Sequence, residues 1–82
     1  NADSVDTLAQ ILIAKGDKEA ALKLYSDIAT RPILNDEVYL NHVELLLQMD
    51  KSALAKRRLA SREFEKEVSL ERIETLKTRY GL

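Results

Sequence analysis

The stretch that decides the fold spans residues 3–32 and reads DSVDTLAQILIAKGDKEAALKLYSDIATRP. Its first half carries apolar side chains at the i, i+3, i+4, i+7 and i+8 spacing that forms one face of a helix. These side chains are Val5, Leu8, Ala9, Leu12 and Ile13. We therefore expect a first helix from about Ser4 to Lys15.

Gly16 and Asp17 mark the connection to a second helix. Glycine tolerates the left-handed conformation at a helix end, and an aspartate carboxylate can cap the helix that follows. Because Pro32 disfavours helical geometry at Arg31, the second helix should close near Thr30. One face of it carries Ala21, Leu24, Tyr25 and Ile28. A connection this short predicts an antiparallel hairpin.

Three further helices are expected after this hairpin, at Asp36–Met49, Ser52–Lys66 and Ser69–Tyr80. Asn35 is a candidate cap for the third helix, and residues Asp50–Ser52 offer capping side chains for the fourth. The third helix is apolar around most of its circumference, so it should be the most buried element. No segment alternates with the period of a strand. The predicted fold class is all-α, with about five helices.

The first hairpin carries a set of residues that recurs in one repeat family. The set comprises Leu8, Ala9, Leu12, Gly16, Asp17, Ala20, Ala21, Tyr25, Ile28 and Pro32. On these residues the stretch resembles the tetratricopeptide repeat, a helix pair of about 34 residues. Small Ala9 and Ala21 let the two helices approach closely, and Tyr25 suits the gap to the next pair. Two departures are Ile28, where a small residue is usual, and Pro32, which falls one place early.

A second copy should begin near Asp36, although its motif residues do not recur. Met49-Asp50 stands at the expected Gly-Asp turn, and Arg58 or Leu59 at the expected aromatic position. The resemblance implies antiparallel hairpins in a right-handed superhelix, with a fifth helix that caps the array. Residues 3–82 would form one domain of a longer protein, and residues 1–2 read as a tag remnant. The alternative is a generic five-helix bundle.

Composition narrows the classes of partner. Charged residues make up 33% of the chain but the net charge is −1, so no general field attracts nucleic acid. The cationic residues Lys56–Arg58, Arg62 and Lys66 are interleaved with glutamates, and we interpret them as a solvated face. No apolar run approaches the roughly 20 residues of a membrane span. The sequence therefore predicts neither nucleic-acid binding nor membrane insertion, and it does not indicate a compartment.

No residue pattern points to catalysis or to a cofactor. Cysteine is absent, and His42 is the single histidine, so a typical zinc site has too few ligands. On a helix the neighbours of His42 are Leu45 and Leu46, neither of which can orient an imidazole. The two glycines both fall at helix ends, which leaves no phosphate-binding loop. We expect a protein that is not an enzyme and that has no metal site and no cofactor.

The family resemblance implies a groove lined by the first helix of each pair, which accepts a peptide or a partner helix. The polar residues nominated for this groove are Asp6, Gln10, Asn41, Glu44 and Gln48. Family members that grip a carboxyl terminus place cations there, whereas Asp6 and Glu44 would repel a carboxylate. The expected partner is a protein or peptide with an apolar or basic segment.

An architectural role is the alternative hypothesis. The fifth helix carries an apolar face that would dock on a longer chain or form a homodimer. The candidate interface residues are Leu70, Ile73, Leu76 and Tyr80, with Val68 and Ile73 as a hydrophobic staple at the start of the helix. A third possibility is an accessory domain of an enzyme whose catalytic residues lie elsewhere.

Overall fold

The computed structural model describes residues 1–29, 31 and 34–82, and all regular structure within them is helical. The helices are α1 (Ala2–Ala14), α2 (Lys18–Ile28), α3 (Asp36–Gln48), α4 (Ser52–Ala60) and α5 (Glu67–Tyr80). The prediction of an all-α fold with about five helices is therefore confirmed. The predicted end of the second helix near Thr30 and Pro32 falls outside the described residues.

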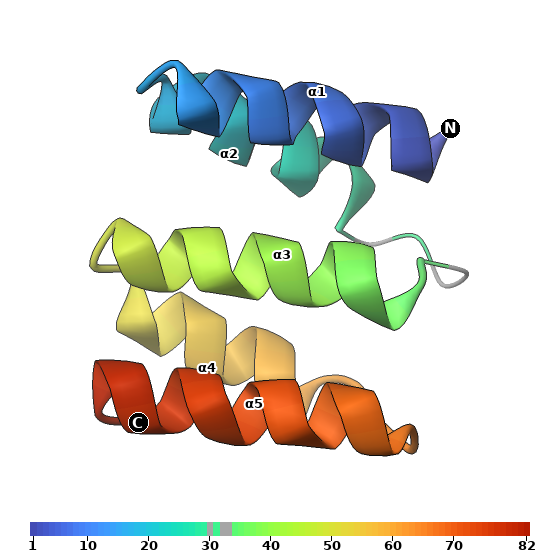
Figure 1. Cartoon of the computed structure of the whole chain (residues 1–82), viewed down its shortest axis with the longest axis vertical. Helices are drawn as coiled ribbons and strands as arrows, with labels where there is room; N and C mark the ends of the chain where they lie inside the picture. Colours follow the sequence, from blue (N-terminus) through green and yellow to red (C-terminus); the bar gives the residue numbers. More distant parts are fainter. Residues whose placement is uncertain (30, 32–33) are drawn as a thin grey trace.

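The helices are arranged around α3, as Figure 1 shows. The α1–α2 hairpin lies on one side of α3, and α4 and α5 lie on the other. Most of α3 is buried, and its buried residues are Val38, Tyr39, Leu40, His42, Val43, Leu45, Leu46 and Leu47. The expectation that the third helix is the most buried element is confirmed, because it packs on elements from both sides.

Side-chain caps fix the starts of three helices. Asp17 accepts a hydrogen bond from the third backbone N–H of α2 at 3.2 Å, and Asn35 does the same for α3 at 2.9 Å. Both caps were predicted. Asn1 also caps α1 at 2.9 Å, so the first residue takes part in the fold. The prediction that a side chain of Asp50–Ser52 caps the fourth helix was wrong. The N-cap of α4 is Lys51, and no side chain accepts a hydrogen bond there.

The end of α1 is closed by a left-handed residue, as predicted. Gly16 has φ +88°, and the N–H of Asp17 donates to the carbonyl of Leu12 at 2.9 Å. This bond and the 3.0 Å bond from Gly16 to Ile13 satisfy carbonyls that the last helical turn leaves free.

The end of α3 repeats this geometry with different residues. Asp50 has φ +59°, and the N–H of Lys51 donates to the carbonyl of Leu46 at 2.9 Å. Asp50 lies 34 residues after Gly16, so the turn falls on Asp50-Lys51 and not on Met49-Asp50 as the sequence predicted. Aspartate is one of the few residues other than glycine that adopt this conformation, so the turn forms here without a glycine.

Buried positions recur at the same spacing of 34 residues. Ala9 and Val43 are both fully buried, and so are Ala21 and Ala55. Ala9, Ala21 and Ala55 are small enough to let the helices approach closely, whereas the second pair has the larger Val43 where the first has Ala9. The two helix pairs therefore share a 34-residue spacing of buried positions, although most motif residues of the first pair do not recur in the second.

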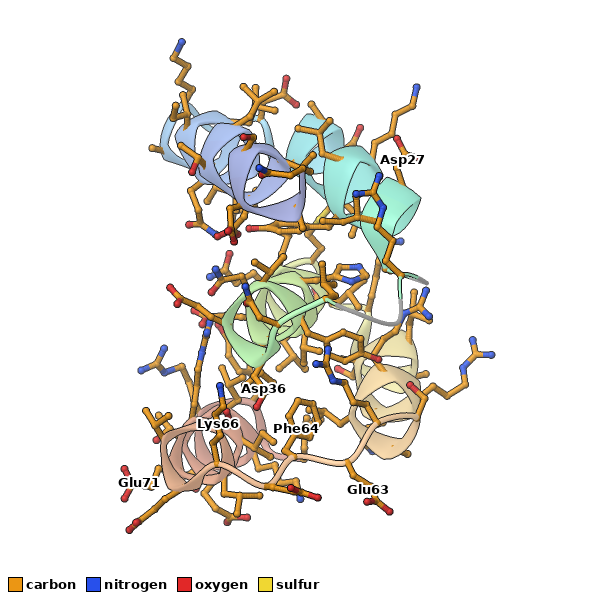
Figure 2. All side chains as sticks on the ribbon, turned by 90° about the vertical axis from the view of Figure 1, so that its right-hand side faces the viewer. Asp27, Asp36, Glu63, Phe64, Lys66 and Glu71 are labelled. Atoms are coloured by element: carbon orange, nitrogen blue, oxygen red, sulfur yellow. The ribbon has the colours of Figure 1, made fainter. Side chains whose placement is uncertain are left out.

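Helix α4 ends at Ala60, six residues before the predicted end at Lys66. The hydroxyl of Tyr39 donates to the carbonyl of Arg58 at 2.8 Å, which occupies an acceptor at the helix end. Phe64 packs against the Tyr39 ring with centroids 5.9 Å apart, and the Arg62 guanidinium lies 4.9 Å from the Tyr39 centroid. Figure 2 shows Phe64 directed into the space between the helices. These contacts override the helical propensity of the segment.

Helix α5 begins at Glu67, two residues before the predicted start at Ser69. Ser69 is buried, and its hydroxyl donates to Asp36 at 2.7 Å, which ties the first turn of α5 to the first turn of α3. Val68 is 70% exposed whereas Ile73 is buried, so the predicted staple between them does not form. The contact with α3, and not a staple, anchors this helix start.

Candidate functional site

The polar residues predicted to line a groove on α1 and α3 lie together. Each takes part in one chain of hydrogen bonds that runs from α1 across α3, and two residues outside the predicted set complete this chain. The predicted members are Asp6, Gln10, Asn41, Glu44 and Gln48. The added members are Tyr25 from α2 and Arg72 from α5. We call these seven residues the polar network.

Asp6 is the junction of the polar network. Its Oδ1 accepts hydrogen bonds from the hydroxyl of Tyr25 at 2.5 Å and from Nδ2 of Asn41 at 3.0 Å. Its Oδ2 lies 3.3 Å from the same Asn41 nitrogen. Gln10 in turn donates to the Tyr25 hydroxyl at 2.7 Å. One half-buried carboxylate thus joins α1 to both α2 and α3.

Tyr25 is buried beneath this junction, and its pKa is raised above the ordinary value of 10.0. Burial is the largest cause, since an anionic phenolate would lack solvation, and the hydrogen bond to Asp6 acts in the same direction. The hydrogen bond from Gln10 and the charge of Arg72 oppose this shift. Tyr25 therefore keeps its proton at neutral pH and acts as a donor to Asp6.

Arg72 brings α5 into the polar network. Its Nη2 donates to Oδ1 of Asn41 at 2.7 Å and to Oε1 of Glu44 at 3.1 Å, and its Nη1 lies 3.5 Å from the carbonyl of Glu37. Gln48 extends the chain by donating to Glu44 at 3.4 Å. Arg72 thus pairs α5 with α3.

A small hollow of about 80 Å³ opens beside the polar network. Ile13 and Leu45 supply its apolar wall, and the exposed side chains of Gln10 and Gln48 lie at its edge. Sites for whole cofactors or drug-sized ligands are usually about 300 Å³ or larger. This hollow has room for the end of one side chain.

The candidate interface residues of α5 are divided between core and surface. Ile73 and Leu76 are buried, because the face that carries them packs on α3. Leu70 is 46% exposed, and Tyr80 is half-buried. The expectation of one outward apolar face is therefore wrong for Ile73 and Leu76, and Leu70 is the member with the most free surface.

The basic residues near the end of α4 do not form one helical stripe. Arg62 and Lys66 follow the end of the helix at Ala60, so their four-residue spacing from Arg58 does not place them on one helix face. Arg62 instead forms an ion pair with Asp36 at 3.2 Å. Figure 2 shows Lys66 near the start of α5 and Glu63 pointing outward on the chain between α4 and α5.

His42 lies in the core, in keeping with a structural role. It is 1% exposed, and neither ring nitrogen has a hydrogen-bond partner among the described residues. Its ring stacks on Tyr25 with centroids 5.7 Å apart. Burial, assisted by the positive charge of Arg58, lowers the pKa of His42 from 6.5 to about 4. The imidazole is neutral at physiological pH.

Within residues 1–29, 31 and 34–82, no three His, Cys, Asp or Glu side chains gather closely enough to hold a metal ion. No helix in these ranges combines the length and the apolar character needed to cross a membrane.

Comparisons with protein-family models, with curated proteins and with solved structures give no match for this chain. The resemblance to tetratricopeptide repeats therefore stays a prediction from the residues of the first hairpin.

Two members of the polar network were missed because each had a simpler explanation. Tyr25 was assigned to packing, and packing alone accounts for its apolar ring. A signal was nevertheless present, since a buried tyrosine hydroxyl needs a hydrogen-bond partner. Arg72 directly precedes the buried Ile73 and lies four residues before Leu76, at the edge of the apolar face of α5. An arginine in that position often lays its stem along the neighbouring helix.

Proposed function

We propose that this chain is a tetratricopeptide-like protein-interaction module that binds a polypeptide segment along α1 and α3, and that it is not an enzyme. The observation that carries the proposal is the polar network. Four of the five polar residues nominated from the sequence line one hollow together with an apolar wall, and the fifth, Asp6, is hydrogen-bonded to Asn41 at its edge. A surface of this composition suits a partner segment that offers both an apolar and a polar side chain.

The charge of the surface favours a basic partner. Asp6 and Glu44 belong to the polar network, and Glu37 lies on the same helix as Glu44. Arg72 and Glu44 offset one another through a 3.1 Å ion pair, whereas Asp6 and Glu37 form no ion pair within the described part of the chain. Complementary charge raises the rate of encounter and suppresses unsuitable partners. We therefore expect a segment with arginine or lysine beside an apolar residue.

Selection from a displayed library of helical peptides tests this proposal. The informative variant is Gln48→Lys, because Gln48 is exposed and lines the hollow without carrying the fold. The matched control is Thr78→Lys, which makes the same charge change at an exposed site on α5 outside the hollow. We expect selected peptides to be basic and to bind the Gln48 variant at least about tenfold more weakly than wild type.

The outcome of this selection is decided by comparing the two variants. Peptides that bind wild type and Thr78→Lys equally, and Gln48→Lys weakly, support the site on α1 and α3. A library that yields no binder contradicts the proposed function. Binders that ignore the Gln48 substitution contradict the proposed location.

The architectural alternative is favoured by a different observation. Four large apolar side chains stay roughly half exposed or more, and they occur in pairs on α1 and α5: Leu8, Ile11, Val68 and Leu70. These helices lie on opposite sides of α3, so copies would stack α1 on α5 (Figure 1). Sedimentation over a range of concentrations should then show association that Leu70→Lys abolishes, whereas a groove binder stays monomeric.

A further inference from the structure

The side chain of Arg72 divides one continuous face of α3. On one side lies the hollow of about 80 Å³, and on the other a wider hollow of about 510 Å³ that reaches the starts of α3 and α5. Arg72 lines both hollows. Apart from Asp36 in the first turn, the α3 residues that line them follow one helical stripe: Glu37, Leu40, Asn41, Glu44, Leu45 and Gln48. A single side chain from α5 therefore separates what would otherwise be one groove.

Three oxygen atoms of α3 converge on this arginine. Asn41 Oδ1 and Glu44 Oε1 accept from Nη2 at 2.7 and 3.1 Å, and the carbonyl of Glu37 lies 3.5 Å from Nη1. A guanidinium group is planar and carries several donors in fixed directions, so spaced acceptors on one helix face match it better than they match an ammonium. The arrangement has the donor and acceptor pattern of a guanidinium-binding site.

The orientation of the Asn41 amide is fixed by a contact with α1. Its Nδ2 is held by the carboxylate of Asp6, whose other partner is the hydroxyl of buried Tyr25. An asparagine amide has one donor end and one acceptor end, so fixing Nδ2 on Asp6 directs Oδ1 toward α5. The acceptor oxygen of Asn41 is thus oriented by Asp6 and Tyr25 independently of Arg72.

We propose that Glu37, Asn41 and Glu44 form a guanidinium-recognition site, which Arg72 fills in the free chain and which an arginine of the partner segment takes over. This inference rests on the proposed function and identifies the partner residue that its groove selects. Arg72 acts as a tethered competitor, because a residue on the same chain has a high effective concentration at the site. Displacing it joins the two hollows into one groove along α3.

Methylguanidinium is a direct probe of this site, with methylammonium as the control for charge alone. The key variant is Arg72→Ala, which empties the site, and Arg72→Leu is its partner because leucine keeps apolar contact with α3. Arg79→Ala removes an exposed arginine of the same helix and serves as the matched control. Binding is followed by the amide NMR shifts of α3, after circular dichroism has verified that helical content is unchanged.

We expect saturable shifts at Asn41 and Glu44 in both Arg72 variants. Wild type and Arg79→Ala should bind methylguanidinium at least about tenfold more weakly, because the tethered arginine must leave first. Glu44→Gln introduced into the Arg72→Ala background should weaken the binding again. Methylammonium should bind worse than methylguanidinium in every variant.

Two results would overturn the inference. One is the absence of saturable shifts in both Arg72 variants, and the other is equal binding by wild type and these variants. The peptide selection separates this failure from that of the proposed function. Selected peptides whose arginines can be replaced by lysine without loss would refute arginine recognition while leaving the binding module intact. Methylguanidinium binding, combined with a library that yields no peptide binder, would contradict the proposed function while leaving the guanidinium site intact.

Discussion

The buried His42 makes a specific prediction about stability at acid pH. Its ring is 1% exposed, and its nitrogens lack partners among the described residues, so the charged form is disfavoured in the folded chain. The pKa falls from 6.5 to about 4 because of burial and then of the Arg58 charge. The unfolded chain therefore binds more protons than the folded chain between these two values. By linkage, the free energy of unfolding falls as the pH falls through that window.

The magnitude follows from the size of the shift. One unit corresponds to about 1.4 kcal/mol, so a shift from 6.5 to about 4 removes roughly 3 kcal/mol between neutral pH and about pH 4. Small domains have total stabilities of about 5 to 15 kcal/mol. The loss from His42 alone is thus a large share of what holds this chain folded.

Urea denaturation of wild type and His42→Leu, followed by circular dichroism across this pH range, isolates the effect. Carboxylates titrate in both proteins, so the difference between their unfolding free energies belongs to His42. Leucine removes the two unpartnered nitrogens and keeps an apolar side chain in the core, so the variant should match or exceed wild type at neutral pH. Its advantage should grow by up to about 3 kcal/mol as the pH falls. Parallel pH profiles for the two proteins would refute the reasoning.

Three further substitutions test the helix ends and the polar network. Gly16→Ala should cost about 1 kcal/mol in thermal or urea unfolding, from left-handed backbone strain alone, because an added Cβ meets nothing within 4 Å; an unchanged midpoint would contradict this. Asp50→Gly should gain about 0.5 kcal/mol, since its φ is +59°, and a loss would show that the aspartate side chain stabilises the turn. Tyr25→Phe should cost about 1 to 2 kcal/mol by leaving Asp6 without its donor, whereas Tyr80→Phe, measured alongside, should change little.

The first hairpin and the third helix were predictable because local chemistry and tertiary packing agree there. Gly16, Asp17 and Asn35 each have one dominant use at a helix boundary, and the structure uses them in that way. The turn at Asp50 was placed one residue early, because the sequence was compared with a Gly-Asp pattern. The turn requires a left-handed backbone conformation at that point, and aspartate, like glycine, can adopt it.

The end of α4 could not be read from the sequence, because residues 61–66 contain neither glycine nor proline. The helix stops where Tyr39 and Phe64 pack together and Tyr39 takes the carbonyl of Arg58. These contacts join residues that are 19 and 25 positions apart along the chain. For the same reason the polar network was foreseen only in part, since its α1 and α3 members share a predicted face and Arg72 reaches them from a third helix.

The polar network also bears on how the chain unfolds. Arrays of helix pairs in which each pair touches only its neighbours can open one pair at a time from an end. Here Asp6 near one terminus and Arg72 near the other are joined through the single side chain of Asn41. Opening the α1 end removes the carboxylate that directs Asn41 toward Arg72, and opening the α5 end breaks the hydrogen bond from Arg72 to Asn41. Amide protons of α1 and α5 should therefore exchange with solvent in one cooperative event, even though the two helices lie on opposite sides of α3.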